Sequence, residues 1–252
     1  MSFKRLLLVP VLLMALAACT QPPTPAEQQK PTANATKFPQ ARTFKNGKSS
    51  FTRVSKNILP IAKQACRTIH TSKANSKCNF RFLIKVKNGS TPDARFTRTP
   101  NGSTVISFNS AMLQFLRDDD EMAMVVAHEM SHQIANHIKR GERELLRAAI
   151  ASAAAAKKAG RNPKTATQKA AETTFIALSR KFELEADRAG TIFMMRAGYN
   201  PDKAINLLDR QPANNIRFRR HPLHPERKKA VRSIAKKFRS DQRNGKTLAL
   251  AF

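Results

Sequence analysis

The sequence predicts a mostly helical domain with a small β-sheet, that is, an α+β fold. Alternation of apolar and polar residues is confined to residues 78–109, and apolar residues recur at helical intervals before and after that segment. Apolar residues make up 41% of the 252 residues, which is ample for one hydrophobic core. We therefore expect one folded domain over residues 43–240 and a C-terminal tail over 241–252.

Residues 1–18 have the pattern of a bacterial secretory signal peptide. Lys4 and Arg5 precede a short apolar run, which is not long enough for a comfortable membrane-spanning helix. The run ends in Leu-Ala-Ala-Cys, which resembles a lipobox, so Cys19 is expected to be lipidated. An ordinary signal with an incidental cysteine is the alternative. Residues 19–42, rich in Pro, Gln, Thr and Ala over their first half, are then expected to form a lipidated flexible tether.

The position after Cys19 and the charge of the chain bear on its location and partners. Thr20 rather than aspartate follows the cysteine, which by the usual sorting rule favours the periplasmic face of the outer membrane of a bacterial cell envelope. The chain has 46 Lys and Arg against 17 Asp and Glu, a formal net charge of +29. Such a surface attracts anionic envelope components, whereas an exported chain rarely meets nucleic acid. A genome-wide bias of composition or an acidic compartment would also explain the charge.

The first half of the domain is expected to contain one helix and two strand regions. Residues 51–70 place apolar residues at helical intervals, with a kink or boundary at Pro60. Residues 78–86 predict a half-buried strand, and a shorter strand pair is expected on either side of the turn at 100–102. Cys66 and Cys78 could form a disulfide in an oxidising compartment or remain buried thiols.

The second half is expected to be helical. A first long helix spans 117–140, with Asp118 and Glu121 at capping-box spacing and Gly141 as its stop. A second helix is expected over 142–160 and a third from about 165 to 197. Pro201 starts a short fourth helix, and a basic last helix covers 225–239.

Residues 128–132 read His-Glu-Met-Ser-His. On a helix, His128 and His132 differ by only about 40° in direction, so both imidazoles can bind one zinc ion. Glu129 lies beside them, where it can contact a metal-bound water. His137 follows His128 by nine residues, about 180° around a continuous helix, so we expect it to face elsewhere as a packing or hydrogen-bonding residue.

A catalytic zinc site needs a third protein ligand and an open position. The long helix that follows carries acidic residues among apolar ones, in a chain with few acids. Glu183 and Asp187 share one face at four-residue spacing, whereas Glu185 points away. We therefore predict that His128, His132 and Glu183 bind the metal. Asp187 would accept a hydrogen bond from a ligand histidine and fix its tautomer.

Four segments occur in the order and spacing of a known family: DDDEMAMVVAHEMSHQIANH, SRKFELEADRAG, AGYNP and HPLHPER. They resemble the HtpX-like and CAAX-prenyl-endopeptidase-like zinc metallopeptidases (M48 type), in particular the LoiP- and BepA-like branch of periplasmic lipoproteins. The resemblance covers roughly residues 50 to 240. It implies a gluzincin-type core, with an active-site helix and a later helix that carries Glu183 as third ligand and Asp187 as its helper.

The resemblance extends to a His-Pro pair followed by arginine, which lies near the metal in the family and corresponds here to His221 and Arg227. It implies that His221 binds metal in a resting state or stabilises the transition state; a loop histidine in solvent is the alternative. Two positions depart from the family pattern. Arg220 stands where threonine is usual, and Asp93 stands where asparagine is common.

These patterns together predict a membrane-anchored zinc metalloendopeptidase with one Zn²⁺ per chain. Zinc would lower the pKa of a bound water to about 7 and Glu129 would act as general base. The substrate would be an extended protein segment added to the sheet edge, and the resemblance suggests misfolded or misassembled envelope proteins. The alternative is a cationic envelope lipoprotein that acts mainly as a chaperone, a scaffold or a binder of anionic envelope components, with little hydrolysis.

Overall fold

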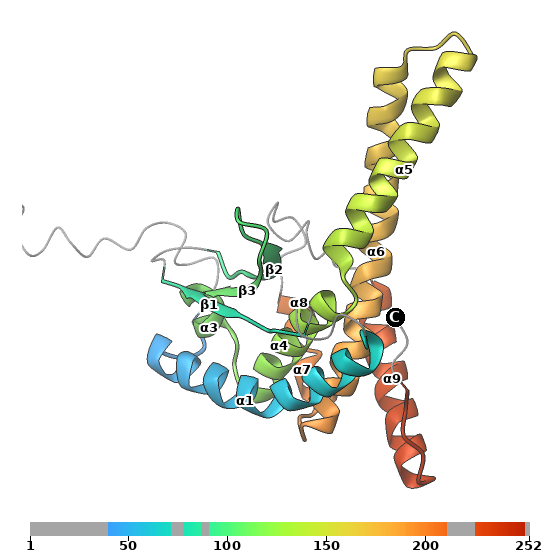
Figure 1. The fold of residues 1–252 in the computed structure, drawn as a ribbon. Helices are drawn as coiled ribbons and strands as arrows, with labels where there is room; N and C mark the ends of the chain where they lie inside the picture. The colour runs from blue at the N-terminus through green and yellow to red at the C-terminus, as the bar shows by residue number, and fades with distance from the viewer. Residues whose placement is uncertain (1–39, 72–77, 87–90, 211–224, 250–252) are drawn as a thin grey trace, which may run out of the picture. The chain divides into compact units, whose positions relative to one another are not determined.

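The computed structural model describes residues 40–71, 78–86, 91–210 and 225–249 (Figure 1). Helices make up most of this part, and a single three-stranded sheet accompanies them, which confirms the α+β prediction. The predicted signal peptide, Cys19 and His221 lie outside the described residues. No helix among the residues that the structure describes is long and apolar enough to cross a membrane.

Helix α1 (Phe44–Ile69) begins earlier than predicted, because the Thr43 side chain caps it by accepting a hydrogen bond from the backbone of Asn46. The helix runs through Pro60, so of the two outcomes predicted there, a kink or a boundary, the boundary is wrong. Pro60 is exposed, and the carbonyl that loses its helical hydrogen bond can therefore bind water. Near the end of α1, Cys66 forms a disulfide with Cys78, which ties the helix to the segment before the sheet.

The sheet consists of β1 (Phe82–Lys85), β2 (Ala94–Arg98) and β3 (Thr104–Asn109), in the order β1-β3-β2. Strand β3 pairs parallel with β1 and antiparallel with β2. The β2–β3 hairpin matches the predicted strand pair, whereas β1 is shorter than the predicted strand over 78–86. Strand β2 pairs with β3 alone among the described residues, so within that part of the chain it is an edge strand of the sheet.

Helix α3 (Ser110–Phe115) leads to α4 (Asp119–Ile134). The Asp118 carboxylate accepts from the backbone N–H of Glu121 at 2.9 Å and caps α4. The predicted capping box is only half formed, because the Glu121 carboxylate accepts from the N–H of Arg117 rather than from that of Asp118.

Helix α4 ends at Ile134, so the prediction of one helix to Arg140 with a stop at Gly141 is wrong. Asn136 adopts a left-handed backbone conformation (φ 55°, ψ 39°), which interrupts the helix and redirects the chain. Asparagine tolerates this conformation better than most residues, which explains why the break falls there. Helix α5 (His137–Lys158) starts directly after it and runs through Gly141.

Helix α6 (Pro163–Arg196) is the longest, capped by Asn162 and started by Pro163. It packs against α5 along the upper part of Figure 1 and against α4 and the last helix, α9 (Pro225–Arg243), below. The short helices α7 (Pro201–Ala204) and α8 (Leu207–Arg210) lie between α6 and α9 in the chain. The predicted third, fourth and last helices thus exist, with small differences at their ends.

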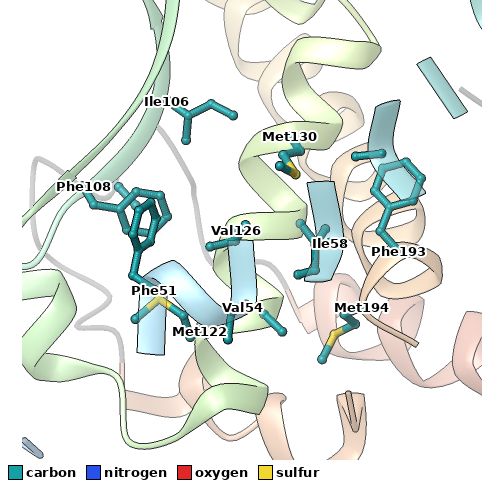
Figure 2. Packing of buried hydrophobic residues seen from close by; sticks show 14 of the residues in the cluster. Phe51, Val54, Ile58, Ile106, Phe108, Met122, Val126, Met130, Phe193 and Met194 are labelled. Atoms are coloured by element: carbon teal, nitrogen blue, oxygen red, sulfur yellow. The ribbon is translucent and has the colours of Figure 1, made fainter. Parts of the chain in front are cut away.

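The hydrophobic core joins α1, β3, α4 and α6 (Figure 2). Its buried side chains include Phe51, Val54, Ile58, Ile106, Phe108, Met122, Val126, Met130, Phe193 and Met194. Helices α4 and α6 approach closely at Gly190, where an added Cβ would lie 3.0 Å from the backbone nitrogen of His128. This approach sets the carboxylates of α6 opposite the histidines of α4.

Candidate metal centre

Three buried side chains on two helices direct their ligand atoms to one point. His128 and His132 come from α4, and Glu183 comes from α6. The two Nε2 atoms lie 2.9 Å apart, and each lies within 3.4 Å of a carboxylate oxygen of Glu183. All three ligand atoms fall within 4.8 Å of one another. Two imidazole nitrogens and a carboxylate oxygen are a donor set that zinc takes in catalytic sites.

The charge of this centre also fits a divalent cation. Glu129, Glu183 and Asp187 bring three buried carboxylates to it, and Arg227 of α9 brings one buried guanidinium. These four groups carry a formal charge of −2, which a divalent cation would neutralise, and uncompensated buried charge is costly. Burial alone would lower the pKa of His128, but the negative charges of Glu183 and Asp187 outweigh it and raise the pKa to about 10.

Asp187 lies behind His128. Its Oδ1 is 2.9 Å from His128 Nδ1, so His128 donates from Nδ1 and directs Nε2 toward Glu183 and His132. Arg227 donates to both oxygens of Asp187 at 2.7 Å and thereby holds the carboxylate in place. Burial would raise the pKa of Asp187, but the positive charge of Arg227 and its hydrogen bonds lower it overall.

Glu129 lies between the histidines and the sheet. Its Oε2 accepts a hydrogen bond from the backbone N–H of Phe96 in β2 at 2.5 Å. The start of β2 is held by Asp93, whose N–H donates to Asn109 Oδ1 at 3.0 Å and whose carboxylate pairs with Arg95. The structure therefore places Asp93 as a support of the strand next to Glu129.

His137 lies against the metal centre, so the prediction that it faces elsewhere is wrong. Its Nδ1 is 2.7 Å from Nδ1 of His132. The 180° estimate assumed a continuous helix, and the left-handed turn at Asn136 breaks that helix and brings the imidazole back to His132. A sequence signal existed in Asn136 itself, since asparagine is a common left-handed residue at helix ends.

Two further residues behind His137 were missed as parts of the site. The carboxylate of Glu185 accepts from His137 Nε2 at 3.0 Å and pairs with Arg140 at 2.6 Å. Burial lowers the pKa of His137 to about 4. Burial would raise the pKa of Glu185, but hydrogen bonds from His137 and Arg140 bring it to about 2. Glu185 does point away from Glu183, as predicted. Its partners lie on α5, and residue spacing alone does not show how α5 packs against α6.

An apolar cavity of about 290 Å³ opens beside the metal centre, between β2, α5 and α6. It reaches His132 and Glu183 at one end. Its apolar lining comes from Phe96, Ile138, Leu145, Phe175, Leu178 and Phe182. The cavity is thus suited to hold an apolar side chain next to the metal-ligand residues His132 and Glu183.

The chain is similar to known metallopeptidases. The model of Peptidase family M48 matches residues 61–235. Over 119 residues, the chain is 29% identical to the beta-barrel assembly-enhancing protease of Yersinia pestis and 28% identical to that of Escherichia coli (strain K12); each match covers 43% of this chain and 24% of the relative. It is 29% identical over 111 residues to the mitochondrial metalloendopeptidase OMA1 of Arabidopsis thaliana, covering 44% of this chain and 22% of the relative. The chain thus matches about a quarter of the length of these relatives.

Proposed function

The chain belongs to peptidase family M48, a family of zinc metallopeptidases, and from that premise we propose that it cleaves proteins as a zinc-dependent endopeptidase. The family membership confirms the resemblance drawn from the four sequence segments. The observation that carries the proposal is the convergence of His128, His132 and Glu183 on one point, next to the carboxylate of Glu129 and the edge strand β2.

In the proposed reaction, His128, His132 and Glu183 hold one Zn²⁺. When bound, zinc supplies a Lewis acid for the scissile carbonyl and acidifies a water molecule. Glu129 is the general base, which takes a proton from the attacking water and passes it to the leaving amine. The hydrogen bond from the N–H of Phe96 supports this role, because it fixes the Glu129 carboxylate at the strand along which a substrate would lie.

The hydrogen-bonding pattern of β2 supports an extended substrate. The carbonyl of Asp93 accepts a backbone hydrogen bond from the N–H of Asn109, and the N–H of Thr99 donates one to the carbonyl of Ser103, both on the β3 side of the hairpin. Since the direction of these groups alternates along a strand, Phe96 directs its backbone groups to the outer edge of β2, where its N–H donates to Glu129 and its carbonyl faces outward. A substrate strand added there would pass Glu129. The apolar cavity would then receive a large apolar side chain beside the scissile bond.

For the whole protein we propose an envelope protease anchored through a lipid at Cys19, on the periplasmic face of the outer membrane. The lipobox-like segment and the net charge of +29 support this location, because the charge favours anionic envelope surfaces. The proposed clients are misfolded or misassembled envelope proteins. The name of the bacterial relatives, beta-barrel assembly-enhancing protease, adds outer-membrane β-barrel proteins to that class.

The test compares wild type with Glu129→Gln, using zinc content and cleavage of unfolded casein. We expect about one zinc per chain in both proteins, chelator-sensitive cleavage by wild type, and a loss of at least about 100-fold in the variant. Cleavage that survives in Glu129→Gln would contradict the role of Glu129. Zinc-free protein that binds anionic vesicles without cleaving casein would instead favour the cationic chaperone or binder.

A further inference from the structure

Nδ1 of the second ligand histidine lies against another histidine, whereas Nδ1 of the first, His128, lies against a carboxylate. His132 Nδ1 and His137 Nδ1 lie 2.7 Å apart, and both residues are buried. Two imidazole nitrogens at that distance form a hydrogen bond only if one carries a proton and the other offers a lone pair. The direction of this bond therefore determines which nitrogen of His132 faces the metal position with a lone pair.

The residues around His137 determine the direction of its hydrogen bond with His132. Its Nε2 lies 3.0 Å from Glu185 Oε2, and that carboxylate also accepts from Nη1 and Nη2 of Arg140, at 2.6 and 3.2 Å. An ionised carboxylate can only accept, so Nε2 of His137 carries the proton and its Nδ1 offers the lone pair. His132 then donates from Nδ1 and keeps a lone pair on Nε2, the atom that lies 3.3 Å from Glu183 Oε1.

Packing holds His137 in this orientation. Its ring is stacked on Phe182, with centroids 4.2 Å apart and planes at 11°. The Arg140 guanidinium lies over the same phenyl ring, 4.9 Å from its centroid. Tilting the ring out of its plane would lose the stacking, and a 180° flip within the plane would lose the contacts of Nδ1 with His132 and of Nε2 with Glu185.

The two ligand histidines are thus supported in parallel ways. His128 is backed by Asp187 and Arg227, in direct contact. His132 is backed by Glu185 and Arg140, with His137 interposed. We propose that His137 is a positioning residue that holds His132 as the Nδ1–H tautomer and directs its Nε2 to zinc. The inference rests on the proposed zinc site.

The test measures zinc affinity of the full chain by competition with a chromophoric chelator. His137→Phe keeps an aromatic ring over Phe182 but removes the acceptor for His132. His137→Asn restores an acceptor near the position of Nδ1. We expect the zinc dissociation constant to rise about 10- to 100-fold in His137→Phe and to return most of the way in His137→Asn. A Co²⁺-loaded sample should show the same order in the shift of its visible absorption bands.

His70→Phe is the matched control. His70 Nε2 lies 2.7 Å from the carbonyl oxygen of Ile134, so this variant removes a histidine contact from the end of α4 without touching the ligands. It should leave zinc affinity unchanged. Glu185→Gln provides a second variant if His137→Phe does not fold, with an expected loss of several-fold in affinity because an amide accepts more weakly than a carboxylate.

The outcomes separate the inference from the proposed function. Wild type that binds no zinc overturns the proposed function. Wild type that binds zinc, together with His137→Phe of equal affinity, overturns only the role of His137. A His137→Asn variant as weak as His137→Phe also overturns it, because the missing acceptor would then not be the cause.

Discussion

Gly190 of α6 lies so close to the backbone of His128 that a Cβ at position 190 would be 3.0 Å from the His128 nitrogen and 3.2 Å from its Cα. Real Cβ contacts this short are rare, and both neighbouring atoms belong to the backbone, which yields little. The distance between α4 and α6 at the metal centre therefore depends on the absence of a side chain here. Glu183 and Asp187 reach the histidines of α4 because of this close approach.

We expect Gly190→Ala to push α6 away from α4 and to lower the free energy of unfolding by about 1–3 kcal/mol. Zinc affinity should fall as well, because the oxygens of Glu183 move away from the histidines. Urea unfolding and chelator competition measure the two effects. Gly141→Ala is the control, since its Cβ would lie at an ordinary 3.6 Å from Phe182 and alanine favours the helix by up to about 1 kcal/mol. Equal stability of the two variants would contradict the argument.

Asn136 provides a second prediction, because its left-handed conformation connects α4 to α5. Asn136→Gly should be tolerated within about 0.5 kcal/mol, since glycine adopts this conformation freely. Asn136→Val should lower the free energy of unfolding by about 1–2 kcal/mol. It should also weaken zinc binding, because His137 would shift relative to His132. Thermal unfolding with a zinc titration tests both, and a valine variant with wild-type values would show that the turn is not constrained.

The same turn marks where prediction from sequence reached its limit. Within one helix, directions follow from residue spacing, so His128 and His132 could be assigned to one face, as could Glu183 and Asp187. That reasoning holds only while the helix continues. Once Asn136 redirects the chain, the direction of His137 cannot be extrapolated from His128.

Contacts between segments that are distant in the chain also could not be predicted from residue spacing. Glu185 was correctly set apart from the ligand face, but its contact with Arg140 depends on how α5 packs along α6. The hydrogen bond from Phe96 to Glu129 likewise depends on where β2 lies relative to α4. The family resemblance, by contrast, could be predicted from the sequence alone. It depends on the order of short motifs, and each motif consists of residues that are neighbours in the chain.

A pH prediction concerns Asp119, which joins α1 to the start of α4. Burial would raise its pKa, but hydrogen bonds from Arg53 and Ser50 and nearby positive charge lower it below the ordinary value of an aspartate. The folded state therefore binds the proton less readily than the unfolded state. The resulting stabilisation is present above about pH 4 and is lost as the pH falls further, through the lowered pKa.

Asp119→Asn should consequently be less stable than wild type at pH 7, by at most about 1 kcal/mol because 30% of the side chain is exposed. The difference should shrink as the pH falls below about 4. Urea unfolding at a series of pH values measures it. Asp202→Asn, which affects an ion pair with Arg239 on the surface, should show a smaller difference throughout. A difference that grows on acidification would have the wrong sign for this account.

The apolar cavity leads to a prediction about cleavage preference. Leu145 of α5 lines it opposite residues of α6, and the cavity reaches His132 and Glu183. Leu145→Phe would occupy part of its roughly 290 Å³ without changing a charged or ligating group. We expect kcat/KM for peptides with phenylalanine beside the scissile bond to fall about 10-fold or more, because the larger side chain takes up space that the phenyl ring would fill and a single methylene in an apolar pocket is worth about 1–3 kcal/mol. Peptides with alanine at that position should change little. Zinc content should equal that of wild type.

Leu146→Phe changes the neighbouring, mostly exposed residue and should leave the preference unaltered. Equal losses for both peptides in Leu145→Phe would mean that the substrate side chain lies elsewhere.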